Sequence, residues 1–292
     1  MRIMRAVALL YVCALIPITL EAQQSALTPG PVASDPQAVS LLQKSLAVQV
    51  GTLQVTDVTL SGTAQRIAGS DDENGTATLK ATVLGDSRID LSFQSGDRSE
   101  IRNHSALPLP SSLPPGIPAP AEPVVQPAGA WSGPDGVMYG MATHNVMTDA
   151  AWFFPVATLA RVLSSQGYLL SYLGPETHDD QSLVHVQITE PLPAADNAPE
   201  QIATLTQHLT QMDVYFDPAT LLPAALDFSI HPDNNAVIDL ATEVRFSEYR
   251  AVSGVEVPFH VQKYVNNGLV LDLQFASAAL NTGVPATAFQ IQ

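Results

Sequence analysis

Alternation of apolar and polar side chains is the strongest pattern in the chain. In residues 238–246 the even positions are apolar except for Thr242, and they alternate with Asp239, Glu243 and Arg245. The same two-residue period recurs in three further segments, 224–230, 257–261 and 269–275. Successive side chains of a strand point to opposite faces, so this period is typical of strands that are half buried. We predict an antiparallel sheet with one dry face and one wet face.

The first half of the chain has the same period in residues 77–83 and 89–93. Asn74-Gly75 precedes the first of these segments and favours a type I′ hairpin turn. The acidic residues 71–73 resemble part of a calcium loop, but the alternating ligands and the distal Glu of such a loop are missing. We therefore interpret residues 71–75 as the approach to a hairpin, and expect roughly ten strands in all.

Three segments have helical signals. Asp35 is a good N-cap, Pro36 suits the first helical position, and Gly51 ends the pattern. A second helical region covers residues 148–167, where Pro155 must kink the helix or start a new one. A third is predicted over residues 199–210. Two or three helices are too few for a parallel α/β fold, so we predict an α+β fold that is mostly antiparallel β.

Short motifs near both ends of the chain resemble the LolA-like superfamily of periplasmic lipoprotein carriers and lipoprotein-sorting proteins. The motifs lie at residues 35–38, 57–62, 212–223 and 244–259, together with Asn281 and Phe289. The resemblance implies an open, incomplete β-barrel that wraps around helices and leaves an apolar cavity. In that superfamily the cavity accepts lipids or the acyl chains of lipoproteins.

The ends of the chain predict its domain organisation. Residues 1–22 have a short basic start and an apolar run that is too short to span a bilayer, which is typical of a secretory signal peptide. We predict a disordered segment at 23–33 and a single LolA-like open-barrel domain at 34–292. Residues 107–134 contain nine prolines, so we expect a Pro-rich excursion over the surface of that domain.

Composition limits the function classes. The one cysteine, Cys13, lies inside the apolar run and not at its end, so it does not fit a lipoprotein signal; without the signal peptide the chain has no cysteine for disulfides or thiolate chemistry. Net charge is −16, whereas nucleic-acid binding depends on an excess of Lys and Arg. We expect no nucleic-acid partner, no stable membrane insertion and a periplasmic or secreted location.

Candidate chemistry is sparse. His178-Asp179-Asp180 is the densest polar triplet, but adjacent residues on a loop point in different directions, so we predict a surface turn and not a metal site. His185 and His260 fall on the polar phase of their strands, which predicts solvent exposure. Nucleophile elbows, phosphate-binding glycine loops and zincin motifs are absent from the sequence. We predict no catalytic residues, no metal and no cofactor.

The function that this pattern favours is non-enzymatic binding of an apolar ligand, such as a lipid or an acyl chain, in a half-barrel cavity. The candidate lid residues share one apolar helix face and are Trp152, Phe153, Val156, Leu159 and Leu163. An ordinary core helix explains the same face. The alternative function is an envelope interaction protein that binds a protein partner through the Pro-rich loop and has no ligand cavity. An enzyme assembled from distant residues is a third hypothesis.

Overall fold

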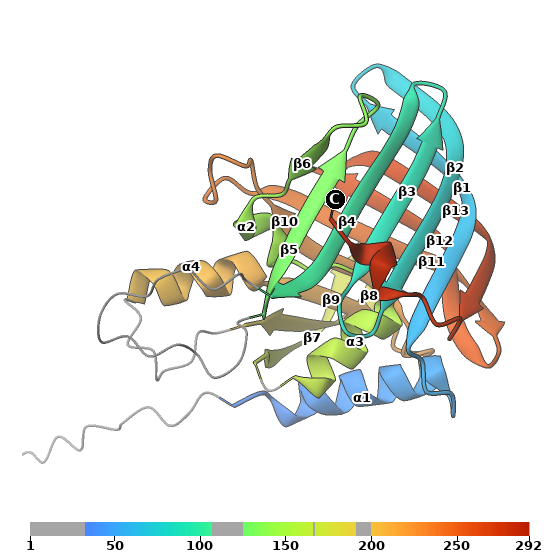
Figure 1. Ribbon diagram of the computed structural model, residues 1–292. Coiled ribbons are helices and arrows are strands. Elements are labelled where there is room, and N and C mark those ends of the chain that lie inside the picture. The colour runs from blue at the N-terminus through green and yellow to red at the C-terminus, as the bar shows by residue number, and fades with distance from the viewer. Residues whose placement is uncertain (1–32, 107–124, 166, 191–199, 292) are drawn as a thin grey trace, which may run out of the picture. The chain divides into compact units, whose positions relative to one another are not determined.

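The computed structural model describes residues 33–106, 125–165, 167–190 and 200–291, with the side chains of 104–106 and 125–127 left out. Within these ranges the chain forms one sheet of thirteen strands in the order β6-β5-β4-β3-β2-β1-β13-β12-β11-β10-β9-β8-β7. All described strand pairs are antiparallel. The order does not pair β6 with β7, so the sheet is an open barrel (Figure 1).

The strands are β1 (Asp57–Ala68), β2 (Asp71–Thr82), β3 (Ser87–Phe93), β4 (Gly96–Ala106), β5 (Val125–Ser132), β6 (Met138–Gly140), β7 (Leu169–His178), β8 (Gln181–Thr189), β9 (Met212–Phe216), β10 (Pro223–Ile230), β11 (Leu240–Val252), β12 (Val255–Val265) and β13 (Gly268–Leu280). The helices are α1 (Pro36–Val50), α2 (Thr143–Val146), α3 (Pro155–Ser164) and α4 (Glu200–Thr210), with a 3₁₀ turn η2 (Ala286–Phe289). The predicted fold class is confirmed. In the described ranges the sheet has more strands than the ten predicted, and α2 is a fourth α-helix.

The sheet consists of two meanders that meet in its middle. Strands β1 to β6 run outward to one edge, and β7 to β13 return from the other edge until β13 pairs with β1. The chain must therefore pass from one edge of the open barrel to the other between Gly140 and Leu169, and α2 and α3 lie in this crossing connection. The connection is the part of the fold that positions the candidate site.

One face of the sheet is covered by α1 and α3, which contact each other (Figure 1). The Asp35 carboxylate accepts a hydrogen bond from the Gln37 backbone N–H at 2.7 Å, and Gly51 ends α1 with φ +55°, as the sequence predicts. Ala38 and Leu42 of α1 are fully buried against apolar side chains of the sheet. We call this side of the sheet the helix face and the opposite side the outer face.

The predicted hairpin turn at Asn74-Gly75 is wrong. The turn lies at Gly69-Ser70, and β2 passes through Asn74 and Gly75 without interruption. A Cβ atom at Gly75 would come within 2.1 Å of the Ser92 carbonyl oxygen of β3. Gly75 is therefore needed for close approach of two strands and not for a left-handed turn, which Gly69 supplies with φ +63°.

The predicted Pro-rich excursion over 107–134 is wrong for its last part, because β5 pairs there with β4. Pro127 lies beyond the three residues of β5 that pair with β6, Ala130 to Ser132. A proline is tolerated at such an edge because its missing N–H would have no partner strand. Residues 107–124 lie outside the described residues.

The outer face of β3 and β4 is covered by η2, which Figure 1 draws in red near the C-terminus. Phe289 is buried there, and its backbone carbonyl accepts a hydrogen bond from Asn103. No helix in the described ranges has the length and hydropathy needed to cross a membrane.

Truncating the buried face of α1 should destabilise the fold. Leu42→Ala removes a fully buried side chain and leaves a cavity, so we expect the free energy of unfolding to fall by about 2–5 kcal/mol. Val48→Ala is the matched control, since Val48 lies on the same helix and is 45% exposed; its effect should stay within about 0.5 kcal/mol. Urea unfolding followed by circular dichroism measures both. Equal effects of the two substitutions would contradict the placement of α1.

Candidate ligand-binding site

Residues 147–154 join α2 to α3 in the crossing connection, and we call them the Trp152 segment. Trp152 is 1% exposed, and its ring packs edge-to-face on Phe153 with 5.6 Å between centroids. Neither residue is helical, because α3 begins at Pro155. A residue before proline is disfavoured in the helical region, and Phe154 lies outside that region with φ −135° and ψ 88°. The predicted helix over 148–167 is therefore wrong in its first part, and Pro155 starts a new helix.

The Trp152 segment is tied to α3 by a buried carboxylate. The side chain of Asp149 is fully buried, and it accepts hydrogen bonds from the Thr158 hydroxyl and from the Arg161 guanidinium at 2.9 Å. Breaking a buried pair of this kind costs several kcal/mol. Asp149 therefore holds the Trp152 segment and α3 together as one unit.

A pocket of about 270 Å³ lies beside Trp152 on the helix face. Its apolar lining comes from Ile89, Leu91, Leu271 and the two tryptophans Trp131 and Trp152. Its polar lining includes Arg98, Glu100 and Lys263. We call this the tryptophan pocket. Its mixture of apolar walls and a few charged groups is the usual composition of a small-molecule site.

Lys263 is the unusual member of this pocket. On β12 it continues the register of Phe259 and Val261, whose side chains belong to the core, so its ammonium group points to the helix face. The ammonium nitrogen lies 4.6 Å from the centroid of the Trp152 ring, a cation–π contact. Burial lowers the pKa of Lys263, and the nearby Glu100 carboxylate opposes that shift.

β4 places charged side chains on the same face. Arg98, Glu100 and Arg102 stand opposite Leu91, Ile89 and Ser87 of β3. Burial alone would raise the pKa of Glu100, but the charges of Arg102 and Lys263 outweigh it, so the pKa is lowered and the carboxylate stays ionised. The Glu100 carboxylate forms an ion pair with the Arg102 guanidinium, with 2.9 Å between the two atoms. The pocket therefore holds more positive than negative charge.

The indole N–H of Trp152 is buried and finds no hydrogen-bond partner among the described residues. Leaving a buried donor unpaired costs about 1–3 kcal/mol. An acceptor oxygen that reached this N–H would satisfy it, and an acidic group in the tryptophan pocket would face the Lys263 ammonium.

The five predicted lid residues do not all lie in this pocket. Trp152 is the one of the five that lines it. Phe153, Val156 and Leu159 are buried in the packed core, and Leu163 is half-buried against it. Whether these four contact a ligand stays a prediction.

The charged residues of the pocket were missed from the sequence, although a signal existed. The residues 255, 257, 259, 261 and 263 share one phase of β12, and position 263 holds the single charge among four apolar residues. A lone lysine in the buried phase of a strand marks a functional or ion-paired position, since Lys is rarely buried without a partner.

A second pocket, of about 380 Å³, lies on the outer face. Asp213, Asp227 and Glu243 line it and stand directly opposite one another on β9, β10 and β11. Like charges in opposed positions repel. Burial raises the pKa of Asp227 to about 7, and the carboxylates of Glu243 and Asp213 add to the shift while His178 opposes it. We call this the acidic pocket.

Histidines and a tyrosine form a stack beside the acidic pocket. Tyr215 lies between His178 and His185, with ring centroids 3.9 and 4.5 Å away. His185 is buried and its Nε2 lies 2.8 Å from the Asp213 carboxylate, so the predicted solvent exposure is wrong. His260 is partly buried as well, because it bonds to Asp272 of the neighbouring strand at 3.0 Å. A position on the polar face of a strand predicts that the side chain has polar neighbours. Polar partners on the adjacent strands can still shield that side chain from water.

The predicted turn after His178 is confirmed. Asp179 and Asp180 have φ +47° and +61° and join β7 to β8 as a two-residue turn. The turn brings His178 and Asp179 to Glu243, which lies 65 residues later than His178. Arg245 forms ion pairs with both Asp179 and Glu243, so this cluster is internally neutralised to a large extent.

The comparisons with known proteins concern the fold. No family model matches the sequence, and no curated protein matches it. A domain from Vibrio parahaemolyticus named for outer membrane lipoprotein sorting is similar in structure, with 11% sequence identity and a TM-score of 0.50 over 87% of this chain and 96% of that chain.

Two further solved structures are similar at lower TM-scores. A LolA superfamily protein from Nitrosomonas europaea has 11% identity and a TM-score of 0.47 over 87% of this chain and 97% of that chain. A protein from Desulfovibrio piger, of a family without assigned function, has 10% identity and a TM-score of 0.48 over 87% of this chain and 96% of that chain. The similarity to the Vibrio parahaemolyticus domain shows a shared fold, which agrees with the LolA-like fold that the terminal motifs predict.

The acidic pocket generates a pH-dependent prediction. The pKa of Asp227 is raised from its ordinary 3.8 to about 7, so between these values the folded state keeps a proton that the unfolded state has lost. The contribution of Asp227 to stability therefore falls as pH rises from 4 to 7. Asp227→Asn removes the charge and should stabilise the protein at pH 8 by on the order of 1–3 kcal/mol relative to the parent.

The measurement is urea unfolding of both proteins at several pH values between 4 and 8. The difference in the free energy of unfolding between the parent and the Asp227→Asn variant should shrink toward zero near pH 4. A constant difference over the whole range, or a destabilised variant at pH 8, would show that Asp227 is ionised normally.

Proposed function

We propose that this protein is a non-enzymatic cell-envelope protein that binds a lipid or an acyl chain in its half-barrel. The tryptophan pocket takes the ligand, with the hydrocarbon against Ile89, Leu91 and Leu271 and the polar group at Lys263 and Trp152. The observation that carries the proposal is the Lys263 ammonium, which lies against the Trp152 ring in a pocket with apolar walls, together with the buried Trp152 indole N–H that has no partner among the described residues.

Burial of hydrocarbon supplies the affinity in this proposal. Each buried methylene contributes about 0.8 kcal/mol, so a chain of several methylenes binds usefully without catalytic groups. Lys263 and Arg98 add selectivity for a ligand whose polar end is acidic, such as a fatty acid or a phosphate-bearing lipid. The name of the Vibrio parahaemolyticus domain, which refers to lipoprotein sorting, agrees with a ligand that has acyl chains.

The pocket has to widen when the ligand enters. Its volume, about 270 Å³, lies just below the range of about 300–1,000 Å³ that is typical of ligand sites. The Trp152 segment and α3 are joined through Asp149, so they would move together as the lid. In the open state this lid would present Trp152, Phe153, Val156, Leu159 and Leu163 to the hydrocarbon.

Export is part of the proposal. The apolar start of the chain and the LolA-like fold are together consistent with a periplasmic or secreted protein that meets lipids in the cell envelope. The ligand would be held away from water during passage between surfaces.

Loss of the Lys263 charge should weaken binding of an acidic probe. Lys263→Met keeps an unbranched apolar side chain one atom shorter and removes the ammonium group, so we expect affinity for dansyl-undecanoic acid to fall about tenfold. Lys80→Met is the matched control, because Lys80 lies on β2 with its side chain on the outer face, opposite Arg88. Fluorescence titration measures both. Equal affinities of the Lys263→Met and Lys80→Met proteins would contradict the placement of the polar group.

Trp152→Ala separates a lid from a purely structural core. Truncating a tryptophan in a packed core lowers the free energy of unfolding by about 3–5 kcal/mol. At the wall of a ligand pocket the substitution should cost less than this and should weaken probe binding about tenfold. Urea unfolding and fluorescence titration give the two quantities. Unfolding of the variant, or no change in either quantity, would remove Trp152 from the site.

A further inference from the structure

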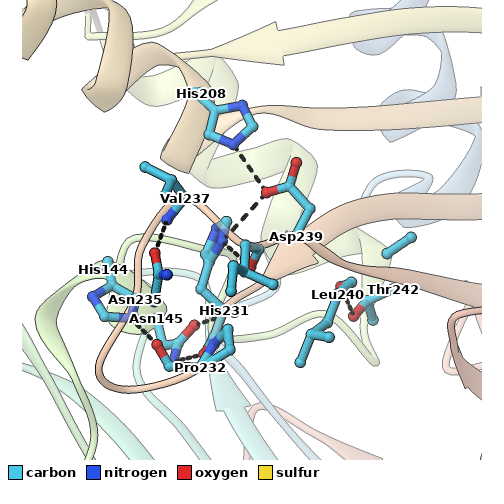
Figure 2. Close-up of polar contacts among 12 residues, drawn as sticks. His144, Asn145, His208, His231, Pro232, Asn235, Val237, Asp239, Leu240 and Thr242 are labelled. Carbon is cyan, nitrogen blue, oxygen red and sulfur yellow. Dashed lines mark hydrogen bonds and ion pairs between the residues drawn. The ribbon is translucent and has the colours of Figure 1, made fainter.

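Two histidines and an aspartate, from α4 and from the connection between β10 and β11, lie together (Figure 2), and two of them, His208 and Asp239, line the acidic pocket. His208 lies near the end of α4, His231 directly follows β10, and Asp239 directly precedes β11. The Asp239 carboxylate oxygen Oδ1 lies 3.0 Å from His208 Nε2 and 3.3 Å from His231 Nδ1. Each residue offers one ligand atom, and these atoms all lie within 4.8 Å of one another.

His231 is the fixed member of this cluster. It is 3% exposed, and its Nδ1 lies 3.1 Å from the Ile238 carbonyl oxygen. A carbonyl oxygen can only accept, so Nδ1 must carry the hydrogen, and in the neutral ring Nε2 then holds a lone pair. Nε2 is buried and has no hydrogen-bond partner in the described part of the chain. Nδ1 is also the His231 ring nitrogen that lies next to Asp239, at 3.3 Å, so a metal ion bound in the cluster would take the place of the Nδ1 hydrogen, which would move to Nε2.

The loop that carries His231 is held in place by α2. The Asn145 side-chain amide of α2 accepts from the His231 backbone N–H at 2.9 Å and donates to the His231 carbonyl at 2.8 Å. His144 contacts the Pro232 carbonyl at 3.1 Å (Figure 2). By contrast, the side chains of His208 and Asp239 are 41% and 46% exposed, so they can adjust around a bound ion.

The electrostatic surroundings favour a cation. The described residues that line the acidic pocket include Asp213, Asp227, Asp239 and Glu243, and no Lys or Arg is among them. Glu243 is paired with Arg245 and Asp227 holds a proton up to about pH 7, so Asp213 and Asp239 supply most of the negative charge in this concave surface, which raises the local concentration of cations. The cluster therefore combines nitrogen ligands with an electrostatic field that attracts positive charge.

We propose that His208, His231 and Asp239 bind one divalent transition-metal ion, of which Zn²⁺ fits the donor set best. Imidazole nitrogens and one carboxylate oxygen are ligands that zinc accepts at about 2.0–2.2 Å. Three protein ligands would leave one coordination position of a tetrahedral ion open for water. This site is separate from the tryptophan pocket and does not depend on lipid binding.

Zinc binding to the chain without its signal peptide, after treatment with EDTA and removal of the chelator, tests the proposal. Isothermal titration with ZnCl₂ should show one ion per chain. His208→Gln and Asp239→Asn should each weaken binding at least tenfold, because each removes one ligand from an exposed position where folding is unaffected. Co²⁺ in place of Zn²⁺ should give the visible absorption of a tetrahedral site, and Asp239→Asn should abolish it.

Two control variants address other places where zinc could bind. His260→Gln removes the histidine of another His–Asp pair, which is 3.0 Å apart and has no second histidine, and it should leave binding unchanged. His178→Gln removes a ligand of the cluster His178–Asp179–Glu243, and it should also leave binding unchanged. No binding by the parent, binding that survives His208→Gln and Asp239→Asn, or binding lost on His178→Gln would each overturn the proposal.

Discussion

The pairing of β1 with β13 is the interaction on which the rest of the structure depends. It joins the two meanders, and without it the chain would form two separate sheets, neither able to enclose α1 and α3. The junction is secured at its end by Asp57, whose carboxylate accepts hydrogen bonds from the Thr282 and Gly283 backbone N–H groups at 2.8 and 3.1 Å. Burial alone would raise the pKa of Asp57, but these bonds and those from Thr56 outweigh it and lower the pKa.

The fold could be predicted from the sequence wherever local chemistry and tertiary structure agree. Alternation identified β10 to β13, and Asp35 with Pro36 identified the start of α1. Local sequence signals gave a wrong prediction where contacts with a neighbouring strand determine the structure. Gly75 looked like a turn residue because the sequence does not show that Ser92 approaches it, and β5 was hidden because prolines at a sheet edge look the same as prolines in a loop.

The candidate site could be predicted only in part. Trp152 stands out because it belongs to a cluster of three consecutive large aromatic residues, 152–154, and it does line the tryptophan pocket. Lys263, Arg98 and Glu100 gather from strands that are distant in sequence, so their meeting depends on the curvature and register of the whole sheet. The same holds for His208, His231 and Asp239, which no spacing rule connects. Sites made of single residues from many elements are visible only after folding.

The position of β13 also has a consequence for the order in which the chain folds. During synthesis β1 to β6 are available first, yet the edge of β1 that faces the middle of the sheet has no partner until residues 268–280 have been made. An unpaired strand edge is a template for association with other chains. The final strand is thus the one that removes the exposed edge from the centre of the molecule, and a chain interrupted before it would keep its two halves apart.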